Sequence, residues 1–211
     1  MKIDSPKIPN DLPSKNFQDI LYEEDPELEL CLINDSSFIN EVLYRTRLSR
    51  MVIKNCKFNE TNFSNIDITD VIFDNCDFSN CNLSHSSIHR AVFKNCKLLG
   101  VDFTESRFGH VEFNQSLMNL ATFGNSKLEK VKLHENSLVH ADFYDCIFKT
   151  VDFKQCDINS ANFEKTSLKG IDISNSNFES LTVSLADLKG CKVSTFQAIQ
   201  FASLIGLVIT D

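Results

Sequence analysis

The sequence predicts an all-β solenoid, a right-handed quadrilateral parallel β-helix of about eight coils closed by a C-terminal helix. The first observation behind this prediction is a large apolar residue at every fifth position from Phe38 to Val193, without one change of register. The second is a small or modest residue two positions before most of them, as at Cys76, Ala91 and Ser106. A short, strict period of this kind is typical of chains in which each unit is buried by its neighbours.

A period of five belongs to neither regular element, because a helix repeats near 3.6 residues and a strand at 2. The large residue and the small residue before it can share a face only where the chain between them is extended. The polar residues that follow, commonly Asn, Ser, Lys or Thr, suit a turn. Each five-residue unit therefore makes one side of a coil, and four sides close a square. Stacked coils then pair as parallel strands, about 4.8 Å apart.

The small inward residues support four sides, because they sort by chemistry when every fourth unit is compared. One column reads Ser36, Cys56, Cys76, Cys96, Ser116, Asn136, Cys156 and Ser176. Another reads Met51, Val71, Ala91, Val111, Val131, Val151, Ile171 and Cys191. A random order of units would not separate small polar residues from β-branched ones.

Three segments follow from this pattern. Residues 1–35 lack the strict period and hold all four Pro residues, so we expect a partly irregular lead-in and a capping coil that includes Leu28 and Ile33. Residues 36–194 form the solenoid. Residues 195–211 are expected to form a helix that Ser194 or Thr195 caps and Gly206 ends, followed by a short strand at 207–209.

The end of a solenoid is an open sheet edge that must be blocked. The C-terminal segment is more apolar than one coil end can bury, so we expect a homodimer formed tail against tail. The alternative is a monomeric cap folded onto the last coil. The expected dimerisation residues are Phe196, Ile199, Phe201, Ala202, Leu204, Ile205, Leu207, Val208 and Ile209.

The sequence offers no persuasive catalytic, cofactor or metal site, and we expect that the protein is not an enzyme. Its six Gly residues are scattered rather than gathered in a phosphate-binding loop, and its five His residues fall at outward positions. The eight Cys residues include no CxxC pair, and we interpret them as small apolar residues of the core. No apolar run approaches the length of a membrane span, and we expect a cytoplasmic protein that binds no membrane.

The formal net charge of −8 is distributed unevenly over the sides of the rod. One side carries an acidic set of Asp102, Glu105, Asp142, Asp145 and Glu164 against only Arg45 and Lys165. Another side carries a basic set of Arg47, Arg50, Arg90, Arg107, Lys127, Lys130, Lys149, Lys169 and Lys189 against Asp67, Asp70, Glu129 and Asp187. An acidic rod near the width of a DNA duplex can compete for a DNA-binding channel. Because few aromatic residues lie among the basic ones, we expect no direct binding of nucleic acid.

The repeat resembles that of the pentapeptide-repeat family, whose consensus is a small residue, Asp or Asn, Leu or Phe, and two polar residues. Good copies are 101–105 (VDFTE), 141–145 (ADFYD) and 161–165 (ANFEK). The C-terminal motifs, at 167–172 (SLKGID), 188–193 (LKGCKV) and 197–209, are similar to those of the Qnr-type proteins, above all their Gram-positive chromosomal members.

The Qnr resemblance implies a rod-like homodimer that binds the type II topoisomerases DNA gyrase and topoisomerase IV and protects them from fluoroquinolones, which gives quinolone resistance. The acidic set then supplies the candidate topoisomerase-binding residues of a partial DNA mimic. The unbroken register leaves no place for the loops that interrupt many Gram-negative members. The resemblance leaves open which of the two enzymes is preferred and whether protection or inhibition dominates. The alternative is a non-catalytic adaptor that binds another protein through its basic side.

Overall fold

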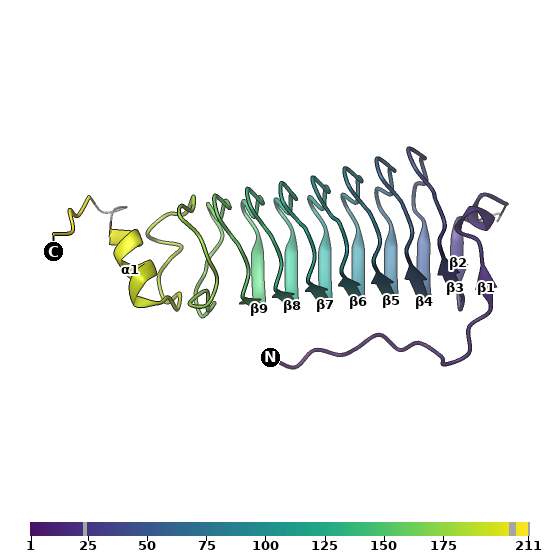
Figure 1. The fold of residues 1–211 in the computed structure, drawn as a ribbon, viewed down its shortest axis with the longest axis horizontal. Coiled ribbons are helices and arrows are strands. Elements are labelled where there is room, and N and C mark those ends of the chain that lie inside the picture. Colours follow the sequence, from purple (N-terminus) through teal and green to yellow (C-terminus); the bar gives the residue numbers. More distant parts are fainter. Residues whose placement is uncertain (23–24, 203–205, 211) are drawn as a thin grey trace.

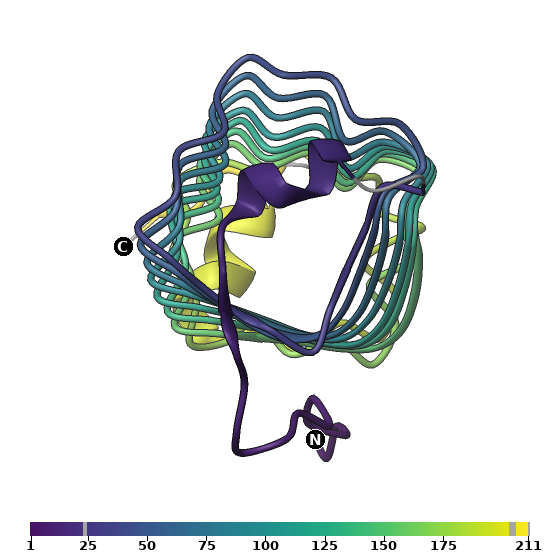
Figure 2. The same cartoon turned by 90° about the vertical axis from the view of Figure 1, so that its right-hand side faces the viewer.

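The backbone winds into stacked square coils that form a rod, as the five-residue period predicts (Figures 1 and 2). This is seen in a computed structural model that describes residues 1–22, 25–202 and 206–210. The rod has about seven turns, close to the eight counted from the sequence, and a short helix at its C-terminal end. The predicted parallel β-helix is therefore confirmed.

Two adjacent sides of the rod form a parallel sheet of long strands. The strands are β4 Arg47–Lys54, β5 Asp67–Asp74, β6 Ser87–Lys94, β7 Arg107–Asn114, β8 Lys127–His134 and β9 Ile147–Lys154. Each pairs with the next at an offset of 20 residues, as Leu48 does with Ile68 and Phe73 with Phe93. Each long strand joins two five-residue units across a bend, whereas the other sides are joined by single β-bridges.

The N-terminal elements close the first end of the rod. They are β1 Ser14–Lys15, the 3-10 helix η1 Phe17–Tyr22, β2 Glu27–Glu29 and β3 Leu32–Asn34. β2 and β3 both pair with β4, and Leu28 and Ile33 are buried, as expected for a capping coil. Phe17 of η1 is fully buried, with its ring centroid 4.7 Å from that of Phe58. The helix thus covers the core that the first coil leaves open.

The corners of the coils have left-handed backbone. The residue two positions after each large apolar one has a positive φ along most of the rod, for example 53° at Asn55 and 57° at Asn75. Asn and Asp tolerate this region better than most residues, and Gly100, with a φ of 63°, takes it without steric cost. Along most of the rod, each five-residue unit therefore contains one left-handed residue that turns the chain at the corner.

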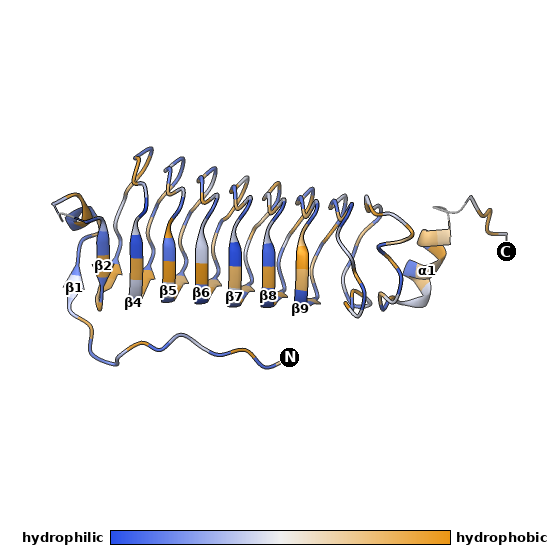
Figure 3. Ribbon diagram, turned by 180° about the vertical axis from the view of Figure 1, so that it is seen from behind, coloured by the Kyte–Doolittle hydropathy of each residue, from blue (hydrophilic) through white to orange (hydrophobic). Residues whose placement is uncertain are grey.

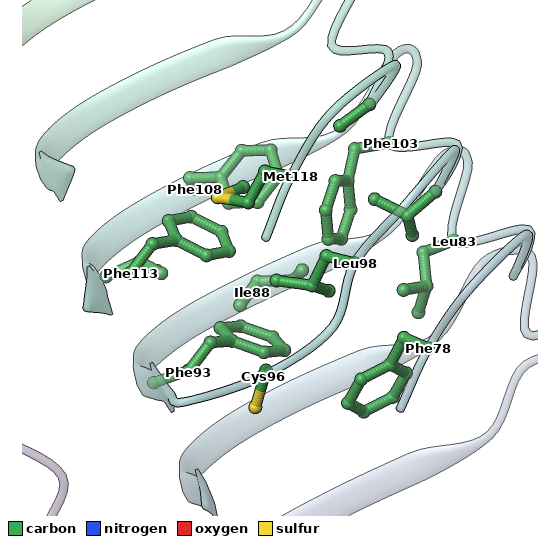
Figure 4. Close-up of a cluster of buried hydrophobic side chains, with 14 of the residues drawn as sticks. Phe78, Leu83, Ile88, Phe93, Cys96, Leu98, Phe103, Phe108, Phe113 and Met118 are labelled. Carbon is green, nitrogen blue, oxygen red and sulfur yellow. The ribbon is translucent and has the colours of Figure 1, made fainter. Parts of the chain in front are cut away.

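Stacked phenylalanines fill much of the core (Figure 4). Phe73, Phe93 and Phe113 stack on one another with ring centroids 4.8 and 4.9 Å apart. A second stack runs through Phe123 and Phe143, whose rings lie 4.8 Å apart and nearly parallel. Because identical positions recur in every coil, each ring covers the next, and burial of this kind stabilises a side chain by about 1.5–3 kcal/mol.

The small inward residues satisfy main-chain carbonyl groups. The Cys81 thiol donates to the Phe58 carbonyl oxygen at 2.7 Å, and the Ser126 hydroxyl donates to that of Phe103 at 2.9 Å. The valine column lies in the long strands, where the sheet itself pairs the backbone. Small polar residues gather instead at inward positions just outside the long strands, such as Cys76 and Ser126. Even the irregular Asn136 is buried and satisfied, since its amide donates to the Phe113 carbonyl.

Helix α1, Thr195–Ala202, closes the second end of the rod. It begins as predicted, with the Ser194 hydroxyl accepting from the Gln197 N–H at 3.2 Å. The strand expected at 207–209 is not formed in the single chain, because no neighbouring strand is available to pair with it. The predicted residues Leu204 and Ile205 lie outside the described residues.

Residues 1–13 form an N-terminal arm that runs back along the outside of the rod from its first coil (Figure 1). The sequence predicted only an irregular lead-in here. Two hydrogen bonds tie the arm to later coils, from the Lys7 N–H to Asp70 Oδ1 at 2.9 Å and from the Asp4 N–H to His110 Nδ1 at 2.8 Å. These contacts join residues 63 and 106 positions apart, which a repeat pattern does not encode.

Candidate interaction surface

The acidic set lies along one side of the rod, as the sequence predicted. Asp102 and Asp142 lie in one column of β-bridges. Thr122 lies between them and forms a parallel bridge with each. Glu105, Asp145 and Glu164 follow in the adjoining turns and are exposed. Parallel coils are about 4.8 Å apart, so equivalent residues two coils apart are separated by about 9.6 Å.

Asp102 and Asp142 belong to the turns more than to the surface. The Asp102 Oδ1 atom accepts the Thr104 N–H at 2.9 Å, and the Asp142 Oδ1 atom accepts the Tyr144 N–H at 3.0 Å. Both side chains are half-buried. Asx turns of this kind fix the corner, so these two carboxylates serve the fold as well as the charge of the surface.

The exposed carboxylates have basic neighbours. Glu105 lies 3.4 Å from His85, an ion pair only when the histidine is protonated. Lys165 lies over the Tyr144 ring, 4.7 Å from its centroid, and also contacts the phenolic oxygen. This contact with Tyr144 and the nearby Asp145 raise the pKa of Lys165. The side is thus acidic in its middle and mixed toward the C-terminal end.

The basic set is partly neutralised within the chain. Arg47 pairs with Glu27 of β2 at 3.2 Å, and Arg50 pairs with Glu29 of the same strand. Arg90 holds Asp70 through two hydrogen bonds. Asp70 was expected on this side of the rod, whereas Glu27 and Glu29 were not, because they precede the regular repeat.

Asp70 is the one acidic residue in a bend column that also contains Arg50, Arg90, His110 and Lys130. Arg90 Nε and Nη2 lie 2.6 and 2.7 Å from its two oxygens, and the Asp70 side chain is 7% exposed. The Arg90 guanidinium, followed by the Lys7 N–H, holds the pKa of this carboxyl below its ordinary value. Its position among basic residues was the available signal that it has a special partner, and the sequence reasoning did not use it.

Beside this column lies a shallow hollow of about 360 Å³ over β6, β7 and β8. His89, Arg107 and Lys127 line it, together with Gly109. A Cβ atom at Gly109 would lie 2.7 Å from His89 Nδ1, so glycine lets the imidazole lie flat over the strand. The His89 and His110 rings are 5.5 Å apart, and burial lowers the pKa of His89.

The thiols are free and their chemistry fits the core interpretation. Burial raises the pKa of both the Cys81 and Cys146 thiols to about 12. A neutral thiol is neither a metal ligand nor a nucleophile. Within residues 1–22, 25–202 and 206–210, no group of three or more His, Cys, Asp or Glu side chains is arranged to hold a metal ion.

The C-terminal end presents apolar surface. Phe196 is 70% exposed and Val208 is 87% exposed, and Ile199, Leu207 and Ile209 are exposed as well. Phe201 instead packs on Phe178, with ring centroids 5.2 Å apart. A hollow of about 350 Å³ lies beside α1 at the last coil and is lined by apolar residues such as Leu185 and Leu188. Among the described helices, none is long and apolar enough to cross a membrane.

Comparison with known proteins agrees with the repeat. A model described as a pentapeptide repeat region matches residues 66–143, and a model of pentapeptide repeats in eight copies matches residues 46–84 and 156–194. None of the curated proteins matches the chain in sequence.

A solved structure shares the fold at low identity, and others resemble the chain less in structure. A trypsin-treated variant of QnrB1, described as a plasmid-mediated fluoroquinolone resistance protein, is 22% identical, with a TM-score of 0.57 over 85% of this chain and 92% of that one. Full-length QnrB1 is 21% identical over 86% of this chain and 100% of that one, with a TM-score of 0.48. HetL from the cyanobacterium Nostoc sp. strain PCC 7120, described as involved in heterocyst differentiation regulation, is 13% identical over 84% and 94% of the two chains, with a TM-score of 0.25.

The two family models together span well over half of the chain, and the repeat they describe is the one that builds the observed square coils. The chain therefore belongs to the pentapeptide-repeat family.

Proposed function

We propose that the protein binds type II DNA topoisomerases, DNA gyrase and topoisomerase IV, as a partial DNA mimic and protects them from fluoroquinolones. The role is non-catalytic and cytoplasmic. The proposal rests on the resemblance of the C-terminal motifs to the Qnr-type proteins, and the fold shared with QnrB1 is consistent with it.

The observation that carries the proposal is the row of exposed carboxylates along one side of a rod. Glu105 and Asp145 are equivalent positions two coils apart, a spacing of about 9.6 Å. One DNA strand carries a phosphate about every 3.4 Å of helix axis, so the two carboxylates are spaced along the rod like phosphates three base pairs apart. A basic DNA channel would therefore attract this side of the rod.

The exposed apolar tail supports the homodimer that the proposal includes. Phe196, Ile199 and Val208 leave a large apolar patch at the end of the rod, which monomeric proteins rarely expose. A second copy related by a two-fold axis buries the patch with itself and gives a long rod. Such a dimer matches the two-fold symmetry of the proposed target.

The test is a gyrase supercoiling assay in the presence of ciprofloxacin, with the protein titrated from well below to well above the enzyme concentration. We expect supercoiling to recover at low protein-to-enzyme ratios. The same titration without drug separates protection from inhibition, and a parallel series with topoisomerase IV decides which enzyme is preferred. The absence of both recovery and inhibition at every protein-to-enzyme ratio would overturn the proposal.

A further inference from the structure

The N-terminal arm matches the coil spacing of the rod. Lys7 contacts Asp70 and Asp4 contacts His110, so three residues of the arm span two coils. Three extended residues cover about 10 Å, and two coils rise by about 9.6 Å. Every third residue of the arm therefore lies level with every second coil. Met1, three residues further on, lines the same hollow as Thr150, which lies two coils beyond His110.

The arm lies on the bend column of the long strands. We call the surface along Arg50, Asp70, Arg90, His110, Lys130 and Thr150 the bend groove. Acceptor groups for the arm recur at alternate coils, and basic side chains occupy the coils between them. Lys130 Nζ lies 3.3 Å from His110 Nε2, which places a basic side chain beside the imidazole that receives the arm.

The arm contacts the rod as a bound peptide ligand would, through backbone N–H groups and through the apolar side chains of one edge. Ile3, Pro6 and Ile8 are half-buried against the rod, whereas Lys2 and Ser5 are exposed. The Asp4 carboxylate lies 3.3 Å from His110 Nδ1. Because prolines restrict the free chain, an extended segment of this kind loses little entropy on binding.

The surface beyond the arm continues the groove. A hollow of about 420 Å³ lies between β9 and the following coil, lined by Phe148, Thr150 and Lys169 among others. β9 ends the sheet, and its Ile147 is 59% exposed. The apolar colouring of β9 is visible in Figure 3. A segment longer than the arm would therefore find further apolar and basic contacts.

We propose that the bend groove is a binding site for an extended, acidic polypeptide segment of a partner protein, and that the N-terminal arm occupies it until displaced. Acidic character follows from Arg107, Lys130 and Lys149, the basic residues along the groove, whereas Arg90 and Lys127 are already paired with Asp70 and Glu129. Extended character follows from the match of three residues to two coils. This site is separate from the acidic set.

A fluorescent peptide of residues 1–12 with the substitution Lys2→Glu serves as the probe. In the observed register position 2 lies near the level of Lys130, so the added carboxylate meets basic charge. The receptor is the full chain, compared with the full-length double variant Asp4→Pro/Lys7→Pro, which removes both N–H donors of the arm and frees the groove. Circular dichroism and thermal unfolding establish that the variant is folded.

We expect saturable binding to the double variant, at least tenfold tighter than to the full chain, where the arm competes. Adding His110→Ala should weaken probe binding to the double variant at least fivefold. The unsubstituted peptide, the matched control, should bind more weakly than the probe in low salt, and the difference should shrink as salt rises.

Equal or absent binding to the two folded proteins would overturn the proposal, as would binding that ignores His110→Ala. If the double variant fails to fold, the full chain alone gives the answer through hydrogen exchange at the Asp4 and Lys7 amides. Faster exchange on addition of excess probe supports displacement of the arm, and unchanged exchange contradicts it. Both readings are independent of topoisomerase assays.

Discussion

Ser194 and Gln197 hydrogen-bond each other twice at the start of α1. The Ser194 hydroxyl accepts the Gln197 N–H at 3.2 Å, and the Gln197 side-chain oxygen accepts the Ser194 N–H at 2.9 Å. The Gln197 Nε2 group then donates to the carbonyls of Ile173 and Ser176, at 2.8 and 2.7 Å. One buried amide thus caps the helix and closes the edge of the last coil.

Gln197→Leu should destabilise the protein by about 2–3 kcal/mol, because it leaves the Ser176 carbonyl and the Ser194 N–H without partners and removes one of the two donors to the Ile173 carbonyl. Urea unfolding measures the loss, and hydrogen exchange should show faster exchange around residues 173–201. Thr195→Ala is the matched control, since Thr195 is exposed on the same helix, and it should cost less than about 1 kcal/mol. Equal losses from both substitutions would contradict the capping role.

The apolar tail should make the protein a dimer in solution. Phe196→Asp combined with Ile199→Asp places charge in the expected interface, and sedimentation equilibrium should then give the mass of a single chain of 24.0 kDa. Thr195→Asp adds charge to the same helix outside the expected dimerisation residues and should leave the dimer intact. A wild-type protein that sediments as a monomer would remove the dimer from the proposed function.

Charge reversal should distinguish the contribution of the acidic set to gyrase protection from that of the overall net charge. Glu105→Lys combined with Asp145→Lys should raise the protein concentration needed for gyrase protection at least tenfold, because both exposed carboxylates of the repeating pair become cations. Glu60→Lys combined with Glu179→Lys changes the net charge equally on another side of the rod and is the control. Asp102 and Asp142 are left unchanged, since their turns need them. Equal effects of the two doubles would mean that overall charge, not this side, governs binding.

Alkaline pH should destabilise the fold through its buried thiols. Burial raises the pKa of Cys81 from 9.0 to about 12, so between these values the unfolded chain binds fewer protons than the folded one. The stability contributed by this thiol is complete below pH 9 and falls as pH rises, by at most about 1.4 kcal/mol per pH unit.

Urea unfolding at pH 7.5, 9 and 10.5 under reducing conditions measures this slope. Cys81→Ser is the comparison, because a serine hydroxyl makes the equivalent bond at Ser106 and Ser126 and does not titrate. The variant should lose less stability between pH 9 and 10.5 than the wild type. Identical slopes would show that Cys81 does not contribute to the alkaline loss.

The repeat made much of the fold predictable. Each inward position, such as Phe93 or Val131, meets its counterparts one coil away, so the contact partners are written into the sequence at a fixed offset. The side of the rod on which the acidic set lies was predictable in the same way, because each of its residues has a known outward position in the five-residue unit. What each carboxylate does was not predictable, because the turn N–H that Asp102 accepts and the His85 ring beside Glu105 are seen only in the structure.

The sequence by itself determined the coil, its core columns and the side on which each charge lies, because a strict period of five leaves one way to bury the large residues. Only the tertiary structure decided the course of the arm and the closure of the end. Asp70 selects Lys7 across 63 positions, and Gln197 selects Ile173 across 24. Such pairs form only after the coils have stacked, since the unpaired backbone and side-chain groups that they satisfy do not lie together before then.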